Sequence, residues 1–205
     1  MELILHPSYF IDVVSLVHLY HCNQLMLETH DNYVKQTYRN RCYIAAANGK
    51  LALNIPIVHQ KSGHSVPYNS IEINQTDDWA TQHLKSIKSA YNSSPFYEYY
   101  EADLHDLFSD IPKLLIDWNI KTLKWTLHLL HITKSIISSE EYQDDIRARQ
   151  LITAKQNPIL STDSYIQVFQ EKHGFLNGLS ALDLLFNLGP SAGVYLKEQQ
   201  YLIKE

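Results

Sequence analysis

The dipeptide Asn48-Gly49 is the sequence feature that most constrains the fold of this chain. It separates two runs rich in apolar residues, at positions 41–47 and 50–57. Asn-Gly favours a type I′ turn because both central positions tolerate a positive φ. The pattern therefore predicts an antiparallel β-hairpin. Pro56, which has no backbone N–H to donate, predicts that the second strand ends or lies at an edge there.

A strand–helix–strand unit is predicted before the hairpin. Residues 2–5 and 25–27 form short apolar runs, and residues 9–20 between them have apolar positions at helical spacing. This order is typical of a βαβ unit, in which the helix connects two parallel strands. A further short strand is predicted at residues 70–73, after a polar loop.

Helical patterns dominate the second half of the chain. Asp77 or Asp78 can cap a helix that runs through position 91, and a second helix is predicted over residues 96–108. Asp110 is predicted to cap a third helix, over residues 110–131, with Pro112 in its first turn.

The last quarter of the chain is less regular. Residues 140–157 predict either a surface helix or a connector, and residues 165–169 predict a strand. A helix over 180–188 starts with Ser180 and Asp183, an arrangement typical of a capping-box variant. Gly189 predicts its end, and Pro190 the start of a last helix.

Together these patterns predict one α/β or α+β domain over residues 1–205. The hydrophobic fraction of 45% is sufficient for a sizeable core. The sheet-forming region covers about residues 1–75, as a short N-terminal βαβ unit plus a β-hairpin. The helix-rich region covers about residues 76–205.

Several classes of function are excluded by motifs that the sequence lacks. None of the 6 glycines forms a GxGxxG or GxxxxGK[ST] run, so no nucleotide cofactor site of those kinds is predicted, and no cofactor is expected. No metal site is predicted either, because HExxH is absent and the 2 cysteines have no ligand spacing. The chain has no signal-peptide pattern and no apolar stretch near the ~18 residues of a membrane span, so we expect a cytoplasmic protein.

The charge distribution is uneven. The net charge of −5 argues against nucleic-acid binding. Residues 32–71 nevertheless contain five Lys and Arg and no Asp or Glu, while the remaining positions carry 12 basic and all 22 acidic side chains. Two interpretations stay open. A β-rich segment can simply disfavour acids, or the segment creates a local positive field for a phosphate or carboxylate ligand.

The densest polar cluster, residues 28–41, overlaps the start of this acid-free segment. If residues 33–41 are extended, alternation places Tyr33, Lys35, Thr37, Arg39 and Arg41 on one face. Arginine offers planar, bidentate geometry that suits phosphate or carboxylate oxygens. The face is thus either an anion site or a solvated strand surface whose cations pair with acids elsewhere.

His83 is the best candidate for a general base. It lies four residues after Trp79 on a predicted helix that can face the cationic segment. Histidine alone has an unperturbed pKa near neutrality, at about 6.5. The alternative is a histidine that lines the core. Nothing in the sequence resembles a Ser or Cys catalytic triad.

The polar cluster also carries a family resemblance. Residues 30–49 resemble the signature of the WbqC-like protein family, in particular its short bacterial members. So do residues 79–100, 165–169, 173–175 and 179–190, in the same order along the chain. Longer relatives open with a His-Gln-Pro-x-Tyr-x-Pro-Trp-like segment, whereas here residues 6–10 lack the later Pro and Trp.

The resemblance implies a biological context. Family members are often encoded in O-antigen or other surface-polysaccharide gene clusters. It also implies a functional role for the polar and aromatic positions that match. His83 is the candidate base among them. The others are candidate substrate-binding residues: Lys35, Arg39, Asn40, Arg41, Trp79, Tyr91, Tyr165 and Gln167.

We therefore expect a transferase-type enzyme of surface-polysaccharide precursor metabolism. Its partner would be a small anionic metabolite, either a nucleotide sugar or an acyl donor, and the sequence does not specify an oligomeric state. The alternative is a non-catalytic module of a glycan-assembly system that uses the tyrosine-rich stretch at residues 97–100 as its contact surface.

Overall fold

The computed structural model describes residues 2–58, 65–154 and 161–199. The fold is a mixed α/β arrangement, as predicted, with one parallel sheet and one antiparallel hairpin. Its elements are β1 (Glu2–Leu5), α1 (Val13–His21), β2 (Gln24–Leu27), β3 (Arg41–Ala46), β4 (Gly49–Asn54), the 3₁₀ turn η1 (Tyr68–Ser70), α2 (Trp79–Tyr91), α3 (Tyr97–Phe108), α4 (Leu115–Leu129), β5 (Ser135–Ser138), α5 (Ile146–Ile152), α6 (Gln170–His173), α7 (Ala181–Leu188), η2 (Gly189–Ser191) and α8 (Ala192–Glu198).

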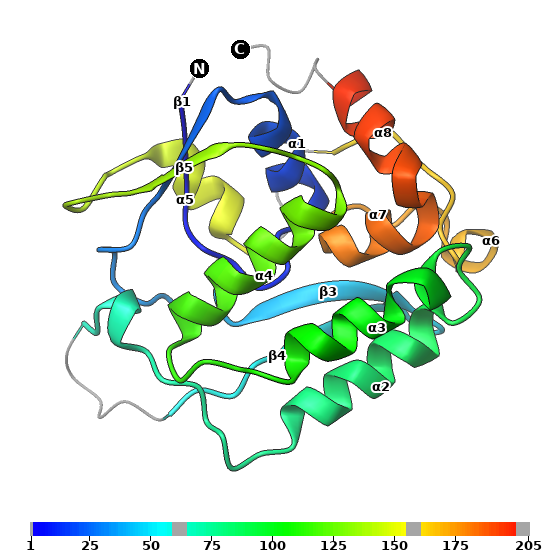
Figure 1. The fold of residues 1–205 in the computed structure, drawn as a ribbon, viewed down its shortest axis with the longest axis horizontal. Coiled ribbons are helices and arrows are strands. Elements are labelled where there is room, and N and C mark those ends of the chain that lie inside the picture. Colours follow the sequence, from blue (N-terminus) through cyan, green and yellow to red (C-terminus); the bar gives the residue numbers. More distant parts are fainter. Residues whose placement is uncertain (1, 59–64, 155–160, 200–205) are drawn as a thin grey trace.

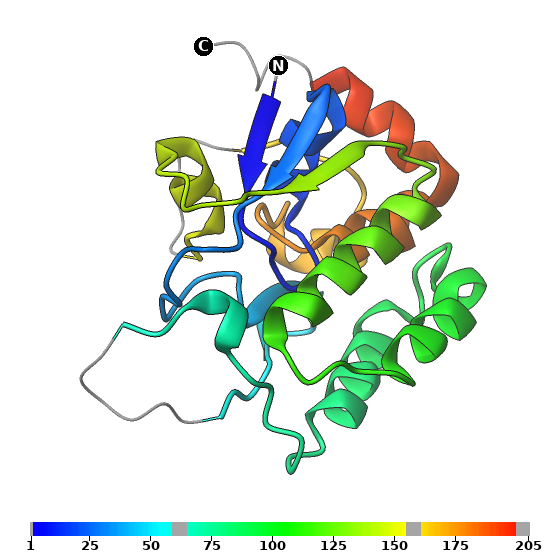
Figure 2. The same cartoon turned by 60° about the vertical axis from the view of Figure 1, so that its left-hand side comes forward.

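The parallel sheet has the strand order β1-β2-β5. Leu3 pairs with Leu25 and Leu5 with Leu27 in β1 and β2, and these four side chains are buried on one face. The predicted βαβ unit is confirmed, since α1 connects β1 to β2. Figure 2 shows the three strands side by side, with their carboxyl ends at the same edge.

The hairpin lies between this sheet and the pair α2–α3 (Figure 1). Strand β3 pairs with β4 in antiparallel register, with Ala46 opposite Gly49. The turn residues are Ala47 and Asn48, neither of which has a positive φ, whereas Gly49, the first residue of β4, has a φ of 102°. The predicted hairpin is thus confirmed, but its turn is not the predicted type I′ turn. Helices α2 and α7 pack against β3, so the hairpin is covered on more than one side.

The extended conformation considered for residues 33–41 is not formed. Strand β3 begins only at Arg41, and the preceding residues form turns. Gln36 has a φ of 61°, which is left-handed and breaks the alternation of side chains. Lys35, Arg39 and Arg41 therefore do not share one strand face.

The predicted start of α4 is also wrong. The helix begins at Leu115 rather than at Asp110, and its N-cap is Leu114. Leu114, just before the helix, forms an isolated bridge with Glu72. The Leu115 N–H donates to the Ile71 carbonyl at 2.9 Å. Asp110 instead accepts a hydrogen bond from Lys121 at 3.0 Å.

Two predicted strands are replaced by other structure. Around residues 70–73 the chain forms η1 and then isolated bridges at Glu72 and Ile73. Residues 165–169 form no strand, and the backbone N–H of Gln167 donates to the Gln170 side chain at 3.2 Å. The Asp183 carboxylate accepts hydrogen bonds from Tyr165 and Gln167, and the start of α7 has no side-chain cap.

Strand β5 was not predicted, although it completes the parallel sheet. Residues 140–157 were left open, and their described part contains α5, which packs beside β1. Positions 155–157 of that range lie outside the described residues. No helix in the described part of the chain is long and apolar enough to cross a membrane.

Candidate functional site

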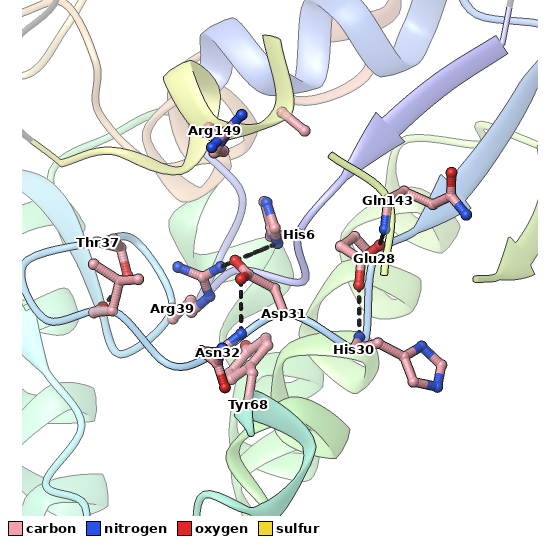
Figure 3. Close-up of polar contacts among 12 residues, drawn as sticks. His6, Glu28, His30, Asp31, Asn32, Thr37, Arg39, Tyr68, Gln143 and Arg149 are labelled. Atoms are coloured by element: carbon pink, nitrogen blue, oxygen red, sulfur yellow. Dashed lines mark hydrogen bonds and ion pairs between the residues drawn. The ribbon is translucent and has the colours of Figure 1, made fainter. Parts of the chain in front are cut away.

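Polar side chains gather at the edge of the sheet where the parallel strands end. His6 directly follows β1, Glu28 follows β2 and Ser139 follows β5. Carboxyl ends of parallel strands meet at one edge, and open α/β sheets bind their ligands outside that edge. Figure 3 shows His6, Glu28, Asp31 and Arg39 together at this place.

Arg39 forms the centre of the cluster. Its side chain is 1% exposed, and its guanidinium donates to the Asp31 carboxylate and, at 3.1 Å, to Nδ1 of His6. Arginine has no acceptor atom, so Nδ1 of His6 must be the acceptor and the ring proton lies on Nε2. We name His6, Asp31 and Arg39 the carboxyl-edge network.

His6 is held in its neutral form. Burial, together with the positive charge of Arg39, lowers the pKa of His6 to about 4, although the charge of Asp31 acts in the opposite direction. A neutral imidazole with its proton on Nε2 can donate a hydrogen bond but is a weak base. Asp31, at 16% exposure, is the member of the network that reaches solvent.

Neighbouring groups fix the position of Arg39. Its guanidinium lies 5.2 Å from the centre of the Tyr68 ring, within the range of a cation–π contact. The side-chain amide of Asn119 donates to the Arg39 carbonyl at 2.6 Å and to the Tyr68 hydroxyl at 2.5 Å. The Tyr68 hydroxyl donates in turn to the carbonyl of Pro7 at 2.8 Å. Helix α4 is thereby tied to the loop after β1 and to the Arg39 segment.

Glu28 joins the loops that follow β2 and β5. Its fully buried carboxylate accepts from the backbone N–H groups of His30 and Gln143, each at 2.6 Å. The Thr29 N–H donates to the Ser139 hydroxyl at 3.1 Å. These bonds hold both loops beside the carboxyl-edge network (Figure 3).

The rim of the site comes from the segment between β5 and α5 and from α5 itself. Arg149 pairs with Asp144, and both side chains are at least half exposed. Asp145 caps α5 by accepting from the Ala148 N–H at 2.6 Å. Tyr142 is 46% exposed. Desolvation raises the pKa of Tyr142, and the charges of Asp144 and Asp31 raise it further.

Among the described residues, no hydrogen bond joins Lys35, Asn40 or Arg41 to this cluster. Lys35 lies exposed on a turn. The Asn40 amide donates to the Ile55 carbonyl at 3.1 Å. Arg41 is half-buried, and its charge acts on Tyr33, as that of Arg39 does. The charges of Arg39 and Arg41 therefore act on the same tyrosine, whereas Lys35 is exposed.

His83 and Trp79 lie in a separate, aromatic part of the core. Nδ1 of His83 is 2.9 Å from the Tyr9 hydroxyl, and its ring centre is 5.1 Å from that of Trp79. Trp79 packs in turn against Phe108 and Trp118. Burial lowers the pKa of His83 to about 4. Among the described residues, no hydrogen bond or ring contact joins this group to Arg39.

Tyr91, Tyr165 and Gln167 converge on one carboxylate, that of Asp183. They donate to it at 2.8, 2.6 and 2.9 Å respectively. The Tyr91 hydroxyl also accepts from the Ala45 N–H at 3.1 Å. We name Tyr91, Tyr165, Gln167 and Asp183 the Asp183 network. It ties α2, the irregular segment after residue 161 and α7 to the hairpin.

Sequence reasoning missed most of the residues at the sheet edge. His6 and the positions from Glu28 to Asp31 follow the apolar runs of β1 and β2 directly, and this position at a strand end was the available signal. Tyr142 and Arg149 had no such signal, because β5 itself was not predicted. Over the described residues, no cluster of three or more His, Cys, Asp or Glu side chains is placed to hold a metal ion.

The comparisons with known proteins give one positive result. No curated protein and no solved structure matches the chain significantly. The model of the WbqC-like protein family matches residues 15–166, which is most of the 205-residue chain. That match includes β2, the Arg39 segment and the rim from Tyr142 to Arg149. The chain belongs to the WbqC-like protein family.

Proposed function

We propose that this protein is a cytoplasmic, transferase-type enzyme of surface-polysaccharide precursor metabolism that acts on an anionic, nucleotide-linked sugar. We place its site at the carboxyl edge of the β1-β2-β5 sheet. The observation that carries this proposal is the carboxyl-edge network, in which Arg39 is ionised and buried beside Asp31 and a neutral His6. Burying charges is expensive, and perturbed ionisable groups cluster at functional sites. The polysaccharide context follows from membership of the family.

The exposed residues of the rim would contact the ligand. Arg149 pairs with Asp144 at the surface, where such pairs contribute little free energy, so its guanidinium can exchange that partner for a phosphate. Lys35 is exposed on a nearby segment and adds a second cation. Tyr142 offers a half-exposed ring on which a sugar or base can stack.

The buried residues would position the reacting group. Asp31 is partly exposed, so its carboxylate can accept a hydrogen bond from the hydroxyl or amine that receives the transferred group. Arg39 and His6 lie behind it and hold its orientation. Since no activated nucleophile lies in the network, direct transfer fits better than a covalent intermediate.

The other matching residues receive structural roles in this proposal. His83 and Trp79 belong to the aromatic core, and Tyr91, Tyr165 and Gln167 belong to the Asp183 network. Arg41 stays a candidate for a phosphate contact, because it is half-buried beside Tyr33.

Calorimetric titration tests the proposal. The probes are UDP-glucose, UDP and glucose 1-phosphate, each with the full chain. We expect at least one to bind, and Arg149→Gln to weaken it roughly 10–100-fold, as loss of a charged hydrogen bond does. Lys85→Gln, an equal charge change on the exposed face of α2, is the control. Absence of binding by every probe, or equal binding by Arg149→Gln, would contradict the proposal.

A second candidate function is the non-catalytic module of a glycan-assembly system. Of the tyrosine-rich stretch, Tyr97 and Tyr100 are buried, whereas Tyr99 is 75% exposed. Tyr99 lies at a hollow of about 280 Å³, next to Pro190. A module that docks here predicts that Tyr99→Ala abolishes surface polysaccharide in a complemented deletion strain and that Arg149→Gln does not. The enzyme predicts the reverse.

A further inference from the structure

A small cavity lined by buried residues lies between His6 and helix α5. Its volume is about 10 Å³, which matches the space that a single water molecule needs. The polar residues of its wall are His6, Ser8 and Ser15, all less than a tenth exposed. The rest of the wall is apolar and comes from Leu5, Ile11, Ala148, Leu151 and Ile152.

The side chain of His6 forms part of the wall of this cavity and is 1% exposed. Nδ1 accepts from Arg39, so Nε2 carries the proton. Figure 3 shows the ring turned so that this second nitrogen points away from Asp31, toward α5. A buried N–H group needs an acceptor, because leaving it unpaired costs the desolvation of the group.

Ser15 presents an acceptor on the wall of the cavity. Its hydroxyl donates to Oδ2 of Asp12 at 2.6 Å, and its backbone N–H donates to Oδ1 of the same carboxylate at 3.0 Å. The hydroxyl hydrogen is therefore used, and the lone pairs of the Ser15 oxygen remain to accept a hydrogen bond. Asp12 is the N-cap of α1 and is itself buried.

We propose that this cavity binds one water molecule, which accepts from Nε2–H of His6 and donates to the hydroxyl oxygen of Ser15. All hydrogen bonds then run in one direction: from Arg39 to His6, to the water, to Ser15 and to Asp12. The chain joins the cation of the carboxyl-edge network to a second buried carboxylate, and Ser15 and Asp12 become positioning residues for His6.

The consequence is a fixed tautomer of His6. With the proton held on Nε2 by the water, Nδ1 keeps its lone pair for Arg39, and Arg39 stays directed at Asp31. If the proton moved to Nδ1, two donors would face each other across the 3.1 Å contact with Arg39. The importance of this arrangement for catalysis rests on the proposed function, but the water site itself does not.

Nuclear magnetic resonance of the ¹⁵N-labelled full chain at pH 7 tests the inference. We expect ring ¹⁵N shifts that assign the His6 proton to Nε2, and a cross-relaxation signal between that proton and a long-lived water. Ser15→Ala should abolish the water signal and mix the two tautomers. Ser86→Ala, which removes an exposed helical hydroxyl on α2, is the control and should change neither.

Either of two results would overturn the water site: a His6 proton on Nδ1, or a wild-type protein without the water signal. A Ser15→Ala variant that keeps both the tautomer and the water signal would show that Ser15 is not the acceptor. The wild-type measurement needs no variant to fold. It is also independent of the titrations with UDP-glucose, so failure of the water site and failure of the proposed function are distinguishable.

Discussion

The carboxyl-edge network and the Asp183 network are both buried and polar, but they differ in what they contain. The first pairs a cation with a carboxylate, includes a neutral histidine and reaches solvent at Asp31. In the second, one carboxylate accepts hydrogen bonds from neutral side chains only, those of Tyr91, Tyr165 and Gln167. Asp183 is 0% exposed.

The difference separates a site from a structural lock. When neutral donors use all the acceptor positions of a buried carboxylate, they stabilise one arrangement of the elements that they join. No acceptor position then remains for a ligand. At the sheet edge, by contrast, Nε of the buried Arg39 has no hydrogen-bond partner among the described residues, and Asp31 is open to an incoming group. We therefore expect mutations in the first network to affect binding as well as folding, and those in the second to affect folding alone.

The largest expected effect is that of Arg39→Met. The change leaves Asp31 as an unpaired carboxylate in a largely buried place, which typically costs about 3–5 kcal/mol. Denaturant unfolding of the variant and of the wild type at pH 7 measures the loss. A loss below about 1 kcal/mol would mean that the ion pair is not formed as described.

The second prediction is that pH affects the two networks in opposite directions. The pKa of His6 falls from 6.5 to about 4 on folding, so the unfolded chain binds the extra proton as the pH drops through that window. Through His6, the free energy of unfolding of the wild type should therefore fall by roughly 3 kcal/mol between pH 6.5 and pH 4. The cost of His6→Gln should therefore shrink as the pH falls.

Asp183 should show the reverse dependence. Burial raises the pKa of Asp183, while its hydrogen bonds lower it less, so the folded state holds the proton more tightly than the unfolded state does. The stabilisation that comes from this tighter proton binding is present at low pH. It is lost as the pH rises through the pKa of Asp183 in the folded state. The cost of Asp183→Asn should therefore grow as the pH falls. Unfolding at pH 7, 6 and 5 checks both trends, and equal slopes for the two variants would remove the distinction.

The third prediction concerns Tyr165→Phe in the Asp183 network. Loss of its hydrogen bond to a charged group should cost about 1.5–3 kcal/mol. The affinity for any nucleotide sugar that the wild type binds should stay within about twofold. A stable variant that has lost binding would instead place Tyr165 in the ligand site.

The smallest effect on stability is expected for Tyr142→Ala at the rim. Tyr142 is half exposed, so the change should alter the free energy of unfolding by about 0.5 kcal/mol or less. Its affinity for UDP-glucose should nevertheless fall about tenfold, and Tyr142→Phe should keep the wild-type value because the ring remains. Equal affinities for all three proteins would exclude stacking at this position.

Local signals predicted much of the fold. Asn48-Gly49 predicted the hairpin because this dipeptide favours tight turns, although the two turn residues are Ala47 and Asn48. The starts of α2 and α3 lay within a residue of their predicted positions, although the N-cap residues Asp78 and Phe96 make no side-chain capping hydrogen bond. Strand β5 could not be predicted in the same way, because a four-residue parallel strand is defined by its partner β2 and not by its own sequence.

The site was predicted only in part. The cationic segment pointed to Arg39, but the left-handed Gln36 breaks the assumed alternation. Asp31 lay within the densest polar cluster but was given no role, because its pairing with Arg39 and His6 depends on the tertiary fold. Tyr91 and Tyr165 matched the family pattern as well as Arg39 did, although tertiary contacts place them in another network. A motif of polar residues does not distinguish a ligand site from a structural hydrogen-bond network.

The most direct test of the account is a chemical-shift map of the full chain titrated with UDP-glucose. We predict that the perturbed amides cluster at the sheet edge, around Asp31, Tyr142 and Arg149. Perturbations centred on Asp183, or on His83 in the aromatic core, would contradict the central claim that the carboxyl edge of the parallel sheet is the ligand site.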